Sequence, residues 1–68
     1  MDSKNLVYMA NQIARNLGAQ GEEPAITATA AHIREYWEPR MINALCTAGP
    51  DGLDPIARAA LTRINAPS

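Results

Sequence analysis

The stretch HIREYWEPRM, His32 to Met41, decides the fold of this chain because it places a proline inside an otherwise helical pattern. Pro39 lacks an amide proton and clashes with the carbonyl group four residues earlier, so it kinks or restarts a helix. The residue before a proline is pushed out of helical geometry, which predicts a helix end near Glu38. The same stretch holds the only Trp, the only His and one of the two Tyr residues. It is therefore either a centre of core packing or a surface that contacts another molecule.

On the N-terminal side of this stretch, the sequence predicts two helices. The first covers about Ser3–Leu17, with Asp2 or Ser3 as its cap and Gly18 where a left-handed cap residue is expected. The second begins after residues 22–24 (Glu-Glu-Pro), since acids and a proline both suit a first helical turn. Apolar residues at steps of three and four predict one buried stripe on each helix. These stripes are Leu6, Met9, Ala10, Ile13, Ala14 and Leu17, and then Ile26, Ala30, Ile33 and Trp37.

On the C-terminal side, two further helices are expected. A short third helix covers about Pro39–Thr47, and AGPDG (residues 48–52) forms a turn. Leu53 as an apolar staple, Asp54 as N-cap and Pro55 at the first helical position mark the start of the fourth helix, which Asn65-Ala-Pro ends. The inward positions are Met41 or Ile42, Leu45 and Cys46 in the third helix, and Ile56, Ala57, Ala60, Leu61 and Ile64 in the fourth.

The expected fold class is all-α, a small bundle of three to four short helices with a kink or restart at Pro39. No segment alternates with the period of two that strands show, and residues 1–68 are expected to form a single small helical domain. Hydrophobic residues make up 47% of the chain, but many of them are alanines. A core of this size rarely contributes more than about 3–5 kcal/mol of stability. One Cys excludes an internal disulfide, so stabilisation by a partner protein is favoured.

Charge and hydropathy argue against two classes of partner. The formal net charge is −1 and the isoelectric point is near 5.6. The six Lys and Arg residues are scattered along the chain, so the clustered basic surface that binds nucleic acid is missing. No apolar stretch approaches the roughly 20 residues of a membrane span, and no secretory signal pattern opens the chain. A cytoplasmic location without membrane or nucleic-acid binding is expected.

Neither candidate for reactive chemistry supports catalysis by this chain. His32 precedes the core position Ile33, so a half-buried His bonded to backbone or carboxylate is favoured over a catalytic group. Cys46 lies near the apolar face of the third helix, with nothing basic beside it to activate a thiolate. One His and one Cys cannot complete a zinc site without carboxylates. Catalytic, cofactor-binding and metal-binding residues are therefore expected to be absent.

The aromatic stretch favours a protein-binding role instead. Tyr36 is rotated by about 100° from Trp37 on a helix, so one of them can serve the core while the other faces outward. Tyr, Trp, Arg and Met are enriched at protein–protein contacts. For Trp37, internal packing and an interface role remain equally open, whereas Tyr36, Arg40 and Met41 are assigned to an interface. The full set of predicted partner-binding residues is Tyr36, Trp37, Pro39, Arg40, Met41, His32, Asn11 and Gln12. Asn11 and Gln12, together with Tyr8, form a second candidate face on the first helix, where a face that is only solvated is the favoured interpretation.

Three segments of the chain stand out together: MANQIARNL (residues 9–17), HIREYWEPRM (32–41) and LDPIARAAL (53–61). In their order and spacing they resemble the delta subunit of cytoplasmic NAD-dependent formate dehydrogenases. The resemblance covers nearly the whole chain, and the second segment is its most specific part. Tyr36 stands where the family often has Phe, and Glu38 where Asp is common, which weakens the cap before Pro39.

The resemblance implies an accessory subunit without a cofactor of its own. In such complexes an alpha subunit holds a molybdenum or tungsten bis-pterin centre and iron–sulfur clusters, where formate is oxidised to carbon dioxide. Beta and gamma subunits carry electrons through iron–sulfur clusters and FMN to NAD. The delta subunit is expected to bind the alpha subunit and to support its stability, assembly or cofactor insertion.

Two alternatives remain open. The chain is either a stoichiometric subunit or a transient maturation chaperone of the catalytic subunit that leaves before the enzyme is active. A small helix-turn-helix regulator is the other alternative, since short helices around turns imitate that motif, but the acidic isoelectric point opposes it.

Overall fold

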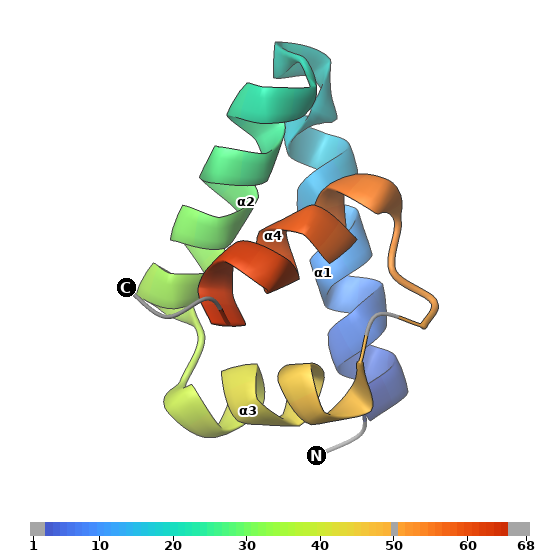
Figure 1. Ribbon diagram of the computed structural model, residues 1–68, viewed down its shortest axis with the longest axis vertical. Coiled ribbons are helices and arrows are strands. Elements are labelled where there is room, and N and C mark those ends of the chain that lie inside the picture. Colours follow the sequence, from blue (N-terminus) through green and yellow to red (C-terminus); the bar gives the residue numbers. More distant parts are fainter. Residues whose placement is uncertain (1–2, 50, 66–68) are drawn as a thin grey trace.

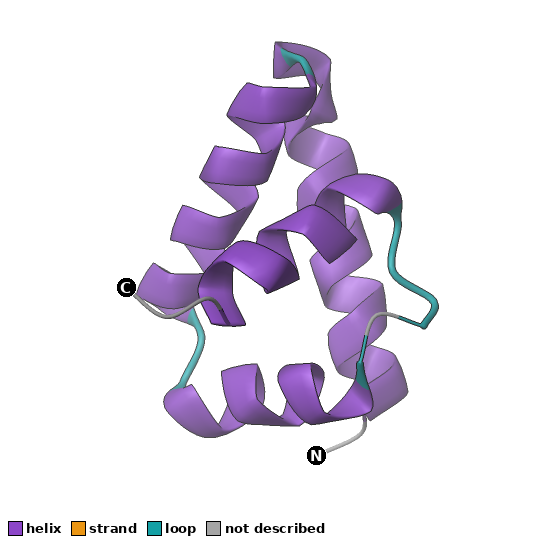
Figure 2. Ribbon diagram, viewed as in Figure 1, coloured by secondary structure: helices purple, strands orange, loops and turns teal. Residues whose placement is uncertain are grey.

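The computed structural model describes residues 3–49 and 51–65, and nearly all of these are helical (Figure 2). The described part of the chain contains the helices α1 (Ser3–Leu17), α2 (Glu22–Tyr36), α3 (Pro39–Ala48) and α4 (Pro55–Asn65), with a short 3-10 helix η1 (Gly18–Gln20) after α1. No strand occurs among these residues. The predicted all-α class and the helix restart at Pro39 are confirmed.

The α1–α2 hairpin confirms both predicted stripes and corrects one prediction about a glycine. Gly18 does not take a left-handed cap conformation, because the chain continues into η1 and the positive φ of 105° falls at Gly21 instead. The amide of Gly21 donates to the carbonyl of Gly18 at 3.2 Å and closes that turn. Asp2 lies outside the described residues, as does the side chain of Ser3, so the predicted N-cap is not described.

The core is built from the predicted stripes. Leu6, Ala10 and Ala14 of α1 are buried, and Met9, Ile13 and Leu17 are half-buried at the edge of the stripe. All four positions predicted for the second helix are buried, and the last of them, Trp37, lies just after the end of α2. The residues that form the central cluster are Leu6, Ala10, Ala14, Ile33, Trp37, Leu45, Leu53, Ala57 and Leu61.

The last two helices cover one side and one end of the hairpin. Figure 1 shows α4 crossing in front of α1 and α2, while α3 lies across the base. α4 packs chiefly against α2, and α3 packs against α1. Leu45 is the buried centre of α3, and Met41, Ile42 and Cys46 are half-buried beside it. Leu53 is buried just before α4 begins at Pro55, as the predicted staple requires.

Polar contacts join the end of α4 to α2. The Arg63 guanidinium bonds the Glu23 carboxylate at 2.7 and 3.0 Å and the Thr27 hydroxyl at 2.8 Å. Arg34 of α2 donates to the backbone carbonyl of Arg63 at 2.8 Å. The bond from Arg34 satisfies a carbonyl in the last turn of α4, which lacks a partner within its own helix.

Candidate functional site

The chain turns sharply between α2 and α3, and this corner carries most of the predicted partner-binding residues. Trp37 (φ −89°, ψ 141°) and Glu38 (φ −68°, ψ 150°) are both extended, and the following Pro39 requires this of Glu38. The Trp37 amide donates to the Ile33 carbonyl at 2.9 Å and closes α2. The Glu38 carbonyl accepts from the amides of Met41 and Ile42 at 2.9 and 3.2 Å and opens α3. The Glu38 side chain makes no cap hydrogen bond.

The two neighbouring aromatic residues have opposite environments. Trp37 is 7% exposed and belongs to the central cluster, whereas Tyr36 is 70% exposed. Of the two alternatives left open for Trp37, the structure shows internal packing. The Trp side chain holds the corner against the core, and the Tyr side chain projects from it.

Tyr36 is paired with His32 one helical turn earlier. Their ring centroids lie 4.7 Å apart with an interplanar angle of 43°. Residues four apart share a helix face, and aromatic rings at this separation attract each other. His32 is exposed, so the expectation of a half-buried histidine at the stripe edge was wrong. The buried stripe of α2 is narrower than the sequence suggested, because His32 lies far enough around the helix from Ile33 to reach solvent.

The charged residues of the corner are paired only loosely. Arg40 Nε lies 3.1 Å from Glu38 Oε2, with side chains 78% and 62% exposed. An ion pair this exposed contributes little to stability, so the guanidinium remains available to other groups. Pro39 is exposed, while Met41 is half-buried and packs against the core. We define the corner surface as His32, Tyr36, Arg40 and the exposed part of Met41.

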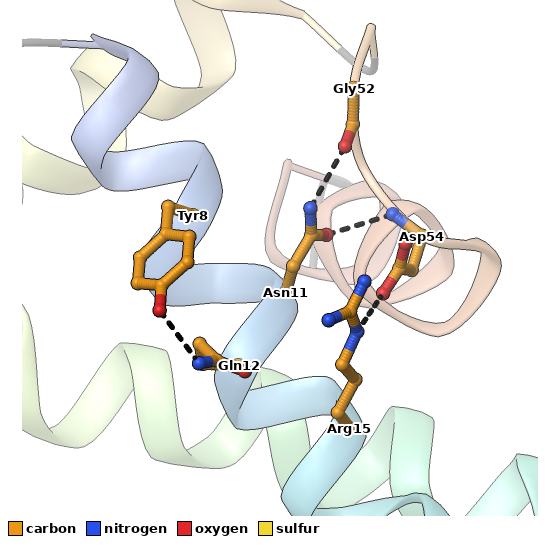
Figure 3. A network of polar contacts seen from close by, with 6 residues as sticks. All are labelled: Tyr8, Asn11, Gln12, Arg15, Gly52 and Asp54. Carbon is orange, nitrogen blue, oxygen red and sulfur yellow. Dashed lines mark hydrogen bonds and ion pairs between the residues drawn. The ribbon is translucent and has the colours of Figure 1, made fainter.

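The two predicted residues on α1 have different environments from each other (Figure 3). Asn11 bonds within the chain: its Nδ2 donates to the Gly52 carbonyl at 2.9 Å, and its Oδ1 accepts from the Asp54 amide at 2.8 Å. Gln12 points to the other side of α1 and donates to the Tyr8 hydroxyl at 2.9 Å. Tyr8 is 61% exposed. No hydrogen bond or ring contact among the described residues joins Asn11 or Gln12 to the corner surface.

Sequence reasoning missed the role of Asn11 and of its neighbour Arg15. Arg15 Nε lies 3.1 Å from Asp54 Oδ2, so two side chains of α1 bind the segment that leads into α4. Asn11 and Arg15 are four apart, which places them on one helix face. That spacing was visible in the sequence, but the partner segment was not.

The reactive groups of the chain are not assembled into a site. Cys46 is half-buried, and burial raises the pKa of its thiol above the ordinary value. That direction disfavours the nucleophilic thiolate. Within residues 3–49 and 51–65, no group of three or more His, Cys, Asp and Glu side chains is arranged to hold a metal ion. None of the helices in this same part of the chain has the length and hydrophobicity needed to cross a bilayer.

Comparison with known proteins identifies a family that the chain matches. Residues 5–61 match the family described as the NADH-dependent formate dehydrogenase delta subunit, FdsD. No curated protein and no solved structure matches the chain. Because the match spans most of the chain and includes all three resembling segments, the chain belongs to this delta-subunit family.

Proposed function

We propose that this chain is a non-catalytic accessory subunit of an NADH-dependent formate dehydrogenase, and that it binds the catalytic alpha subunit through the corner surface. Family membership supports the assignment to such an enzyme. The observation that carries the docking proposal is the contrast at the corner, where Trp37 is 7% exposed and Tyr36 beside it is 70% exposed.

The corner surface has the properties of a preorganised contact. Pro39 and the buried Trp37 fix the backbone, and the His32 ring restrains the Tyr36 ring at 4.7 Å. A side chain that is already ordered loses less conformational entropy on binding. Tyr and Arg are also the residue types that contribute most to protein interfaces when a partner buries them. Arg40 would bond carboxylates or backbone carbonyls of the alpha subunit.

Of the second predicted contact, on α1, the proposal keeps Gln12 but not Asn11. The side-chain donor and acceptor of Asn11 both bond the segment around Asp54, so Asn11 serves the fold. Gln12 and Tyr8 remain as an exposed polar pair that a partner can contact.

The chemistry of the side chains supports placing the iron–sulfur clusters in other subunits. The chain has one Cys, and iron–sulfur clusters are held by several cysteine thiolates. The described residues supply no metal-ligand cluster either. The metal, flavin and NAD sites of the complex would then belong to the other subunits, and this chain would support the alpha subunit's stability, assembly or cofactor insertion.

A pull-down tests the docking surface. The double variant Tyr36→Ala/Arg40→Ala should release the tagged chain from the alpha subunit while its helical circular dichroism is unchanged, and adding Met41→Ala should complete the release. The matched control is Arg58→Ala, which removes the same type of side chain as Arg40→Ala from an exposed position of α4. Undiminished co-purification of the double variant would refute the placement.

Two further measurements separate the possible roles. Size analysis of purified active enzyme should find the chain in stoichiometric amount, whereas a transient chaperone would be absent. Deletion of the gene should then be followed by assay of the catalytic subunit and its molybdenum. Loss of protein indicates stabilisation, and loss of metal at normal protein level indicates a role in cofactor insertion.

A further inference from the structure

The helices are not held to the rest of the chain equally, and α3 is held least. Within Pro39–Ala48, Leu45 is buried and every other residue is exposed or half-buried. Helix α4 buries Ala57, Ala60 and Leu61. It packs against both α2 and α1, whereas α3 packs mainly against α1. Because the free energy of docking a helix grows with the apolar area that it buries, α3 is docked less firmly than α4.

Polar contacts between side chains of different elements also leave α3 out. Arg63 joins α4 to α2, and Asn11 and Arg15 join α1 to the segment before α4. Among the residues that the structure describes, no side-chain hydrogen bond joins α3 to another helix. The side chain of Arg40 bonds Glu38, which directly precedes α3. Helices α1, α2 and α4 thus form a cross-linked body, to which α3 is attached by apolar contacts.

Both ends of α3 are breaks in helical geometry. Trp37 and Glu38 are extended before it, and Gly49 has φ 83° after it. A few residues at the ends of an element are enough to absorb the dihedral changes of a hinge motion. Trp37 belongs to the central cluster, so the hinge on the α2 side is anchored in the core. Helix α3 can therefore move as a unit without unwinding α2.

The corner surface spans the joint between α3 and this body. His32 and Tyr36 lie on α2, whereas Arg40 and Met41 lie on α3. Opening of α3 would carry the second pair away from the first. A partner that contacts both pairs binds the closed arrangement more tightly, and a ligand shifts an equilibrium by its difference in affinity for the two states.

We propose that α3 opens as a unit from the body formed by α1, α2 and α4, and that the alpha subunit holds α3 closed when it contacts the corner surface. The second part rests on the proposed function, whereas the first concerns the isolated chain. Segments with few buried apolar contacts open at the lowest free energies. In the open state Leu45 leaves the core, while the bonds of Arg63 and Asn11 keep the body together.

Hydrogen exchange in the full-length isolated chain tests the opening. Amides of residues 43–48 should share one free energy of opening. Their protection should be at least about tenfold lower than that of central α4 amides, equivalent to about 1.4 kcal/mol. Their exchange should also respond less to urea below the unfolding transition, because the urea dependence follows the surface exposed. Equal protection and equal urea dependence in all four helices, including no protection at all, overturn the proposal. Protection that declines steadily toward Ala48 indicates fraying of a helix end and overturns it too.

Two matched variants separate α3 from the body. Ile26→Val and Ile42→Val each remove one carbon, from a buried position of α2 and a half-buried position of α3. Ile26 stays packed when α3 opens, so Ile26→Val should lower the protection of α1, α2 and α4 by about two- to tenfold and leave that of α3 unchanged. Ile42→Val should lower the protection of α3. If Ile26→Val lowers the protection of α3 as much as that of α4, the helices unfold together and the proposal is overturned.

Exchange of the chain within the purified complex tests the closure. Protection of the α3 amides should be at least about tenfold higher there than in the isolated chain, again about 1.4 kcal/mol. A complex that retains the chain while α3 exchanges as in the isolated chain overturns the closure. If the alpha subunit does not retain the chain, the proposed function fails, and the isolated chain still decides whether α3 opens.

Discussion

Asn11 Oδ1 accepts a hydrogen bond from the backbone amide of Asp54 at 2.8 Å, across 43 residues of sequence. The same side chain donates to the Gly52 carbonyl at 2.9 Å. One residue in the middle of α1 thus sets where the chain enters α4, and Figure 3 shows the two bonds side by side.

Asn11→Ala should destabilise the fold by about 1–3 kcal/mol, because it leaves the partly buried Asp54 amide without a partner and breaks the exposed bond to the Gly52 carbonyl. Urea unfolding followed by circular dichroism measures the loss. Asn16→Ala is the control, since it makes the same change at an exposed position of α1 and should stay within about 0.5 kcal/mol of wild type. Equal stability of the two variants would show that the Asn11 bonds do not stabilise the fold.

Substitution by alanine should lower the stability of the fold at Gly21 but not at Gly18. Gly21 has φ 105° and ψ 164°, a region that is essentially restricted to glycine and costs other residues about 1–3 kcal/mol. Gly18→Ala should instead be neutral or gain up to about 1 kcal/mol by restricting the unfolded chain. Thermal unfolding of both variants checks this, and a Gly18→Ala variant less stable than Gly21→Ala would contradict the assignment.

Alanine substitutions at Trp37 and at Tyr36 should differ greatly in their effect on the stability of the fold. Removing a buried Trp costs about 3–5 kcal/mol, which equals what a core this small usually supplies. Trp37→Ala should therefore lose most helical signal at room temperature. The free energy of unfolding of Tyr36→Ala should lie within about 0.5 kcal/mol of the wild-type value, since the Tyr36 side chain is 70% exposed. A well-folded Trp37→Ala variant would mean that the corner does not depend on the core.

Thr29→Val should stabilise the chain by about 1 kcal/mol. Thr29 is fully buried, and its hydroxyl has no hydrogen-bond partner among the described residues. Valine keeps the shape and removes the cost of desolvating the hydroxyl. Thr27→Val is the contrast, because the Thr27 hydroxyl accepts a bond from Arg63 at 2.8 Å. Denaturant unfolding of both variants is the measurement, and a less stable Thr29→Val variant would count against an unsatisfied hydroxyl.

The Cys46 thiol should be alkylated slowly in the native chain. Its ionisation should also lower the stability of the fold at alkaline pH. Burial raises the folded-state pKa of its thiol, so the folded state holds this proton more tightly than the unfolded state does. The resulting stability is fully present below the unfolded pKa, about 8.5, and is lost as the pH rises through the folded pKa. Alkylation should accelerate in urea, and the alkaline loss should shrink in Cys46→Ala. Equal alkylation rates with and without urea would contradict this.

The helix boundaries were predictable because the residues that set them act locally. Pro39 and Pro55 begin α3 and α4 where the sequence predicted, and the stripes follow from the helical period. The prediction failed at Gly18, because a glycine after a helix permits a left-handed turn without requiring one. Hydrogen bonding within η1 moved the positive φ to Gly21.

The candidate site was predictable only in part. Adjacent positions on a helix differ by about 100°, so the sequence indicated that one of Tyr36 and Trp37 faces outward. Which of them does so depended on how α2 packs against its neighbours, and the exposure of His32 was decided in the same way. The docking role of the corner surface remains a prediction.

By itself, the sequence determined an all-α chain, the helix starts at Pro39 and Pro55 and the apolar stripes, because proline geometry and helical period act over a few residues. The second helix was predicted to begin after residues 22–24, and the structure begins α2 at Glu22. Only the tertiary structure decided that Asn11 binds the segment entering α4 and that Arg63 joins α4 to α2. Those features depend on how the helices cross, and crossing is set by packing among side chains that are far apart along the chain.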